Sequence, residues 1–152
     1  MPFEMQPIAY VRSPRTNPSD DDWGSVASVI ELAAEYPPGS LAGLEEFSHV
    51  EVLFVFDRVP ESSVETAARH PRGNPAWPRV GIFAQRAKAR PNRLGATICR
   101  IVRREERRLY VIGLDAIDGT PVLDLKPVMK EFLPREPTTQ PAWATELMRG
   151  YW

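Results

Sequence analysis

The chain has 152 residues, 43% of them hydrophobic, with 19 basic and 20 acidic side chains and a formal net charge of −1. This length predicts one domain with one sizeable core, and no apolar stretch approaches the ~20 residues that are needed to cross a membrane. The N-terminus lacks an export signal, and a single cysteine, Cys99, excludes an internal disulfide. These features predict a cytoplasmic protein in which Cys99 is a buried, inert thiol.

The charge is divided unevenly along the chain. Residues 1–68 carry three basic and twelve acidic side chains, whereas residues 69–152 carry sixteen basic and eight acidic ones. Between Arg69 and Arg108 there are twelve basic side chains and two acidic ones. On one face, such a stretch predicts a phosphate-binding surface. The alternative is that the two halves pair their charges across the fold. We favour the phosphate interpretation, because few acidic residues lie near the most basic loop.

In chain order, the first predicted elements are two strands and a short helix. Residues 7–13 read as a strand that stops at a proline, and the β-branched segment 25–32 reads as a second strand. Three adjacent aspartates, Asp20 to Asp22, lie in the loop between them, but no second ligand cluster supports a metal site. Apolar side chains at three-residue spacing predict a short helix over 40–47, with Ser40 as its cap.

The strongest strand signal is the run of aromatic and β-branched residues at 48–58, as expected of a central strand. Residues 59–79 lack periodicity and are rich in Pro, Gly and Arg, so they predict a long surface loop. The apolar run 80–84 predicts a short buried strand. It leads into a basic loop that is stiffened by Pro91 and expected to face an anion or water. The cations of this loop are Arg86, Lys88, Arg90 and Arg93.

The last third of the chain predicts three strands and a helix. Residues 96–102 and 109–114 read as a strand pair around a charged turn, and 122–127 read as a last strand after a tight Asp-Gly turn. Trp143, Leu147 and Tyr151 are spaced by four and predict an amphipathic C-terminal helix, docked on the body or on a partner. Six or seven short strands with few helices predict a mainly β protein, a single small β-barrel or closed sheet.

Several common catalytic motifs are absent. No two glycines form a Gly-x-Gly pair, which excludes a dinucleotide fingerprint and a phosphate-binding glycine loop. One cysteine and two histidines, His49 and His70, cannot make a four-ligand zinc site. No Gly-x-Ser-x-Gly elbow of a hydrolase occurs.

Four stretches of the chain, in this order, resemble the TsaA-like, TrmO-type tRNA methyltransferases. They are residues 8–14 (IAYVRSP), 43–50 (GLEEFSHV), 79–86 (RVGIFAQR) with 90–92 (RPN), and 114–127 (LDAIDGTPVLDLKP). Each stretch is weak alone, but together they are highly specific. The resemblance implies one TsaA-like β-barrel domain over 1–152, with a core at about 7–130 and a helical tail at about 141–152.

The resemblance also implies an activity and partners. The family binds S-adenosylmethionine without a Rossmann fold, works as a homodimer and methylates N6 of threonylcarbamoyl adenosine beside the tRNA anticodon. The implied partners are therefore tRNA and a second copy of the chain, and neither DNA nor a membrane. The cofactor-binding positions, carried over by motif, are Trp23, Gly24, Asp57, Arg58, Arg86, Ala96, Gly113, Leu114, Asp115, Ala116 and Ile117. A carboxylate such as Asp115 can take the ammonium group or ribose hydroxyls, and an arginine can take the carboxylate.

The chain departs from the family pattern at four places. The family usually has Arg-Pro-Asn-Pro-Ile-Gly where this chain has Arg-Pro-Asn-Arg-Leu-Gly at 90–95. It usually has Ala-Thr-Arg-Ser where this chain has Ala-Gln-Arg-Ala at 84–87. The family's Pro-Arg-Gln type segment is replaced by Asp-Asp-Asp-Trp at 20–23. Asp57 takes the place of the histidine that is common after the long strand in the family. The chain therefore looks like a divergent branch.

Methyl transfer to an adenine amine requires an acceptor for the amine proton. We expect Asp118 or Asp124 to accept it while Lys126 orients the site; the alternative is that Asp118 only shapes its turn and the other two are ordinary strand residues. By charge alone, Arg90 and Arg93 are expected to contact substrate phosphate or base, and Lys88 and Asn92 of the same loop are expected to join them as RNA contacts. Two rival functions remain open, a methyltransferase of this fold with another acceptor and a non-catalytic RNA-binding barrel.

Overall fold

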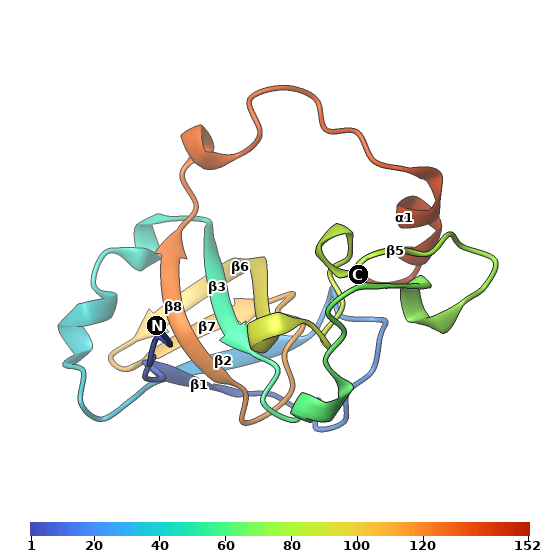
Figure 1. The fold of residues 1–152 in the computed structure, drawn as a ribbon. Coiled ribbons are helices and arrows are strands. Elements are labelled where there is room, and N and C mark those ends of the chain that lie inside the picture. The colour runs from blue at the N-terminus through green and yellow to red at the C-terminus, as the bar shows by residue number, and fades with distance from the viewer.

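Six strands close into an antiparallel barrel in the computed structural model, which describes all 152 residues (Figure 1). Around the barrel the order is β1-β2-β7-β6-β3-β8, and β8 pairs back onto β1. The strands are β1 (Ala9–Arg12), β2 (Ala27–Leu32), β3 (His49–Val55), β6 (Leu94–Glu105), β7 (Arg108–Ile112) and β8 (Pro121–Pro127). The predicted mainly β barrel is confirmed.

The core fills the barrel because side chains alternate along each strand. In β3, Val50, Val52 and Phe54 point inward and are at most 1% exposed, while their neighbours face outward. Gly95 on β6 makes room for the largest of them, since a Cβ at that position would lie 2.6 Å from the Phe54 ring. The interior is thus a packed apolar core.

Two predicted elements are wrong. The helix expected over 40–47 is a pair of 3₁₀ turns, Pro38–Leu41 and Leu44–Glu46, and no side chain caps either one. Gly43 separates them with a positive φ of 98°, a conformation that interrupts a helix. The strand expected over 80–84 is only β5 (Val80–Gly81), which pairs with β4 (Ala68–Arg69) inside the predicted surface loop.

After β5 the chain turns away from the sheet as the 3₁₀ turn Ile82–Ala84. The buried side chain of Gln85 closes this turn, because its Nε2 donates to the carbonyls of Arg69 and Val80 at 3.1 and 3.0 Å. Further 3₁₀ turns lie at Glu61–Ser63, Pro71–Gly73 and Pro91–Arg93. Residues 56–93 therefore form an irregular excursion between β3 and β6.

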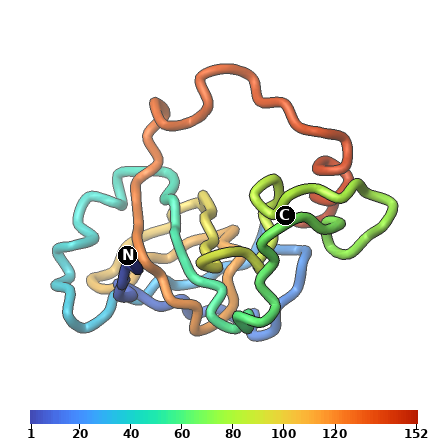
Figure 2. The backbone as a smooth tube through the Cα atoms, in the orientation of Figure 1, coloured from blue at the N-terminus to red at the C-terminus, as the bar shows by residue number.

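The chain after β8 forms an arm, residues 128–141, that contains the 3₁₀ turn Lys130–Phe132 and runs clear of the barrel before it returns (Figure 2). It leads to α1 (Ala142–Leu147), which is shorter than predicted and ends before Gly150, whose φ is +72°. Tyr151 therefore lies beyond the helix. No helix of this structure is long and apolar enough to span a bilayer.

Candidate functional site

Asp115 is the centre of a hydrogen-bonded site at the mouth of the barrel. It lies in the loop between β7 and β8, and its Oδ1 accepts a hydrogen bond from the Thr97 hydroxyl at 2.5 Å. Its Oδ2 accepts one from the Tyr151 hydroxyl. Burial and the charge of Asp115 raise the pKa of Tyr151, so this hydroxyl stays protonated and remains a donor. Two hydroxyls from distant segments therefore hold one carboxylate.

A cation is attached to the residue of β6 that precedes Thr97. The exposed Arg86 donates from Nη2 to the carbonyl of Ala96, the residue before Thr97 on β6. Its positive charge also acts on the Tyr151 hydroxyl, where it works to lower the pKa. Arg86 and Asp115 thus present opposite charges near one short segment of β6. A molecule with both an ammonium and a carboxylate group is complementary to such a pair.

The loop between β1 and β2 forms the opposite side of the site. Trp23 is buried, with the guanidinium of Arg15 4.0 Å above its ring. Gly24 lies beside the β7–β8 loop, since a Cβ on Gly113 would be 3.7 Å from the Gly24 carbonyl oxygen. The Gly113 amide in turn donates to Val26 at 3.0 Å. The two loops are therefore packed together.

Not every predicted cofactor residue joins this site. Leu114 and Ala116 are buried in the core, so only their backbone could contact a ligand. Asp57 and Arg58 follow β3 and are exposed, and Arg58 donates to the Thr16 carbonyl at 3.1 Å. The structure brings together Trp23, Gly24, Arg86, Ala96, Gly113 and Asp115.

The three predicted catalytic residues are not gathered. The Asp118 carboxylate accepts the Ser13 backbone N–H at 3.0 Å, which ties its turn to the end of β1. Asp124 and Lys126 pair with each other at 3.0 Å on the outer wall of β8, and both side chains are about half exposed or more. This arrangement fits the alternative roles of a turn residue and of ordinary strand residues.

Two arginines of the basic loop are bonded to backbone carbonyls. Arg90 donates to the Gln85 carbonyl at 2.5 Å, and Arg93 donates to the Val59 carbonyl at 2.6 Å. Asn92 turns the chain with a positive φ of 63°. The Lys88 carbonyl accepts the Arg90 amide at 2.9 Å, but the Lys88 ammonium group makes no hydrogen bond or ion pair within the chain. Of the four predicted RNA contacts, Lys88 is therefore the cation that is most available to a phosphate.

Charge pairing across the fold also occurs. Three ion pairs join the acidic first half to the basic second half: Arg72–Asp21 at 3.2 Å, Arg104–Glu45 at 3.0 Å and Arg108–Glu31 at 3.5 Å. The alternative interpretation of the charge pattern thus accounts for part of it. No three His, Cys, Asp or Glu side chains converge as metal ligands.

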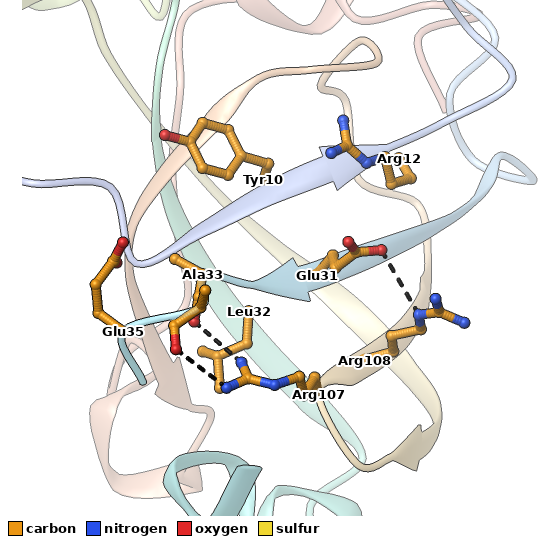
Figure 3. A pocket seen from close by; sticks show the side chains of 9 residues that line it. Tyr10, Arg12, Glu31, Leu32, Ala33, Glu35, Arg107 and Arg108 are labelled. Carbon is orange, nitrogen blue, oxygen red and sulfur yellow. Dashed lines mark hydrogen bonds and ion pairs between the residues drawn. The ribbon is translucent and has the colours of Figure 1, made fainter. Parts of the chain in front are cut away.

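A hollow of ≈ 400 Å³ on the outer wall of β1 and β2 contains three further arginines, of which Arg107 and Arg108 are already bonded and Arg12 is not (Figure 3). Arg107 donates to the Ala33 carbonyl at 3.0 Å, and Arg108 pairs with Glu31 (Figure 3). Arg107 also donates to the Tyr36 carbonyl at 2.6 Å. A second hollow of ≈ 530 Å³ is lined by Arg12, Asp118 and their neighbours. Neither hollow reaches Asp115.

Sequence reasoning missed Thr97 and Tyr151, which both bond Asp115. Thr97 lies within an apolar run that predicts an ordinary strand. Tyr151 continues the four-residue spacing of the helix and reads as part of its apolar face. Its position after Gly150, which favours a positive φ, is the signal that could have separated it from the helix.

The chain is similar to known proteins over most of its length. The family model "tRNA-methyltransferase O N-terminal domain" matches residues 12–132. The "tRNA (adenine(37)-N6)-methyltransferase" of Mus musculus is 43% identical over 96 residues, which are 63% of this chain and 22% of that protein. A "Probable S-adenosyl-L-methionine-binding protein" of Pyrococcus abyssi is 34% identical over 137 residues, which are 86% of this chain and 71% of that protein.

A solved structure has the same architecture. The crystal structure of TrmO from Pseudomonas aeruginosa superposes with a TM-score of 0.75 at 30% identity and covers 94% of this chain and 62% of that one. The chain therefore spans about a fifth of the mouse relative and less than two thirds of the bacterial structure. Because the family model covers residues 12–132, the chain belongs to the tRNA-methyltransferase O N-terminal domain family.

Proposed function

We propose that the chain is an S-adenosylmethionine-dependent methyltransferase that methylates N6 of threonylcarbamoyl adenosine next to the tRNA anticodon. The names of its relatives support the reaction class. The observation that carries the proposal is the attachment of Arg86 and Asp115 to adjacent residues of β6, Ala96 and Thr97, because this offers opposite charges to the amino-acid end of the cofactor.

The residues of the site suit this cofactor. Asp115 would hold its ammonium group or ribose hydroxyls, and Arg86 would hold its carboxylate. Gly24 and Gly113 bring backbone rather than side chains to the same place. The cofactor supplies a methyl group on a sulfonium centre, which is transferred by in-line displacement. The chain's contribution is to position the donor and the adenine amine.

The amine proton needs an acceptor, and Asp118 is the better of the two candidates. It is three residues from Asp115 in the same loop, whereas Asp124 is neutralised by Lys126 on the outer wall. In Asp118→Asn the amide oxygen can still accept the Ser13 N–H, so the turn is kept while the base is removed. We expect kcat to fall by about 10²-fold or more with unchanged cofactor affinity. An equal loss of affinity would assign Asp118 a structural role.

RNA binding is best tested at Lys88. Because its ammonium group is unpaired within the chain, Lys88→Ala removes a charge without removing a bond of the loop. We expect weaker tRNA binding and a salt-dependence slope that is smaller by about one. Lys130→Ala on the exposed arm is the matched control. An unchanged slope for Lys88→Ala would exclude this contact. Arg90→Ala would combine charge loss with loss of its bond to Gln85.

The outer wall of β3 and β6 is the surface on which we expect a second copy of the chain to bind. Leu94 and Ile98 of β6 are 37% and 44% exposed, and Val55 of β3 lies opposite Leu94 in register. This apolar wall continues to Ala96, where Arg86 is attached. We expect Ile98→Glu to convert a dimer to a monomer in sedimentation analysis. Val102→Glu, on the same strand but facing the second hollow, should leave the dimer intact.

The decisive experiment is calorimetric titration with S-adenosylmethionine. We expect saturable binding that is lost in Arg86→Ala, followed by methylation of tRNA that carries threonylcarbamoyl adenosine and not of tRNA that lacks it. Binding without that methylation would favour another acceptor. Salt-sensitive RNA binding by folded protein that takes up no cofactor would favour a non-catalytic RNA-binding barrel.

A further inference from the structure

The C-terminal tail, residues 148–152, lies on the same atoms that the cofactor is expected to use. The Tyr151 hydroxyl donates a hydrogen bond to Oδ2 of Asp115, and the Thr97 hydroxyl donates one to Oδ1. The amide of Trp23 donates to the Tyr151 carbonyl at 2.8 Å. A Cβ on Gly24 would lie 2.5 Å from the carbonyl carbon of Trp152. The tail thus covers three of the residues that make up the site.

The tail is attached to the barrel by a long and weakly held connection. Residues 129–142 are all exposed. Between Val128, whose amide donates to the His49 carbonyl of β3, and Pro141 at the start of α1, the only backbone hydrogen bonds of the arm are the local ones of its 3₁₀ turn. Beyond the arm, Trp143 and Leu147 of α1 are half-buried, and α1 makes one side-chain hydrogen bond to the excursion, from Trp77 Nε1 to Glu146 Oε2 at 2.8 Å. A segment with few buried contacts can open without unfolding the rest of the protein.

We infer that the tail is a displaceable plug, which competes with the cofactor for Asp115 and the Gly24 backbone. This inference rests on the proposed function, because it places the cofactor at the same site. While the tail is docked, both oxygens of Asp115 are engaged by hydroxyls, and backbone fills the space beside Gly24. The apparent cofactor affinity is then reduced by the fraction of molecules in which the tail is docked.

The first test weakens the plug at a position outside the site. Glu146→Ala removes the bond between α1 and Trp77, and both partners lie away from Asp115. Hydrogen exchange without cofactor should show faster exchange of the Trp23 amide, because its acceptor on Tyr151 leaves more often. Calorimetry should show tighter S-adenosylmethionine binding by about three- to tenfold, the factor that one hydrogen bond of this kind represents.

A matched control is Glu131→Ala. This glutamate is also exposed, lies on the arm and makes no side-chain bond, so the variant has the same change of charge without release of α1. It should leave both the Trp23 exchange rate and the cofactor affinity unchanged.

The second variant, Tyr151→Phe, acts at the plug itself. It leaves the half-buried Asp115 under an apolar ring without one of its two donors, so the docked tail is disfavoured more strongly than in Glu146→Ala. The gain in affinity should be correspondingly larger.

The two possible failures can be told apart. If both variants speed up Trp23 exchange but bind the cofactor equally or more weakly than the wild type, the plug model is overturned, and the tail is instead a wall of the site. If exchange of the Trp23 amide is unchanged in both variants, the tail is not held by these bonds and the model is also overturned. If no protein binds the cofactor, including both variants, the proposed function fails instead.

Discussion

The barrel and the C-terminal segment of this chain are built in opposite ways. Each barrel strand is paired on both sides, and the side chains of Val52 and Phe54 are at most 1% exposed. In the arm, Phe132 is 86% exposed, and the tail is held to the site by a few hydrogen bonds. The fold is therefore secured by the barrel alone. The segment that covers Asp115 can respond to a ligand without loss of the fold.

Removing one aromatic side chain from each region should give the largest difference in the free energy of unfolding. Phe54→Ala should lower the free energy of unfolding by about 3–5 kcal/mol, because it empties the centre of the barrel. Phe132→Ala should change it by less than about 0.5 kcal/mol, since its side chain is already in water. Urea unfolding at a concentration where the chain is monomeric measures both. Similar losses would mean that the arm is part of the cooperative unit.

A glycine substitution should separate the two regions without touching the core. In Gly24→Ala the new methyl group would collide with the backbone of Trp152, so the docked tail should be destabilised by about 1–3 kcal/mol. Hydrogen exchange should then quicken at the Trp23 amide and stay slow in β3.

Gly39→Ala is the control for this substitution, because a Cβ there meets nothing within 4 Å. If Gly24→Ala leaves the Trp23 amide as protected as in the wild type, the tail adapts to the methyl group and is more loosely seated than its contacts indicate.

The barrel was easier to predict from the sequence than the segments outside it. The barrel follows from local patterns, since the run at 48–58 and the alternation around it identify β3 and its neighbours. The helix over 40–47 was wrong because apolar spacing says nothing of the positive φ at Gly43. The strand over 80–84 was wrong because Gln85 draws the chain into a turn through bonds to Arg69 and Val80.

The site was only partly predictable, because its bonds join segments that are far apart in sequence. Asp115 and Arg86 came from the motif resemblance, and their charges explain what such positions could bind. Thr97 gave no local signal, since it fits the periodicity of its strand, and the only local signal for Tyr151 is the glycine that precedes it. The basic loop was recognised by charge, but charge does not reveal that Arg90 and Arg93 donate to carbonyl groups.

The reactivity of Cys99 tests how rarely the barrel opens. Burial raises the pKa of this thiol to about 12, with a smaller contribution from Asp115, so at pH 8 only about 10⁻⁴ of it is thiolate. We expect iodoacetamide to label Cys99 only as fast as the protein unfolds. A cysteine introduced as Thr145→Cys on the exposed helix α1 should react at once. Rapid labelling of native Cys99 would show that the barrel opens as readily as the tail.

The smallest expected effect on stability concerns an ion pair that joins a surface turn to the barrel. Glu45, in the 3₁₀ turn Leu44–Glu46, pairs with Arg104 on β6 at 3.0 Å. The bond to Arg104 lowers the pKa of Glu45 to about 2 from 4.5. Because the pKa is lowered in the folded state, the stabilisation is complete above pH 4.5 and is lost as the pH falls towards 2. Glu45→Gln should therefore unfold at a lower urea concentration than the wild type at pH 6, but not at pH 2.

The difference between the two proteins at pH 6 should be small, because the pair is on the surface and salt screens it. Raising the salt to 1 M should remove most of it. If the two proteins unfold at the same urea concentration at pH 6, then the turn is held on β6 by the packing of Leu44 against the core rather than by charge. The turn would then belong energetically to the barrel, whereas a difference that vanishes with salt would leave it as loosely attached as the tail.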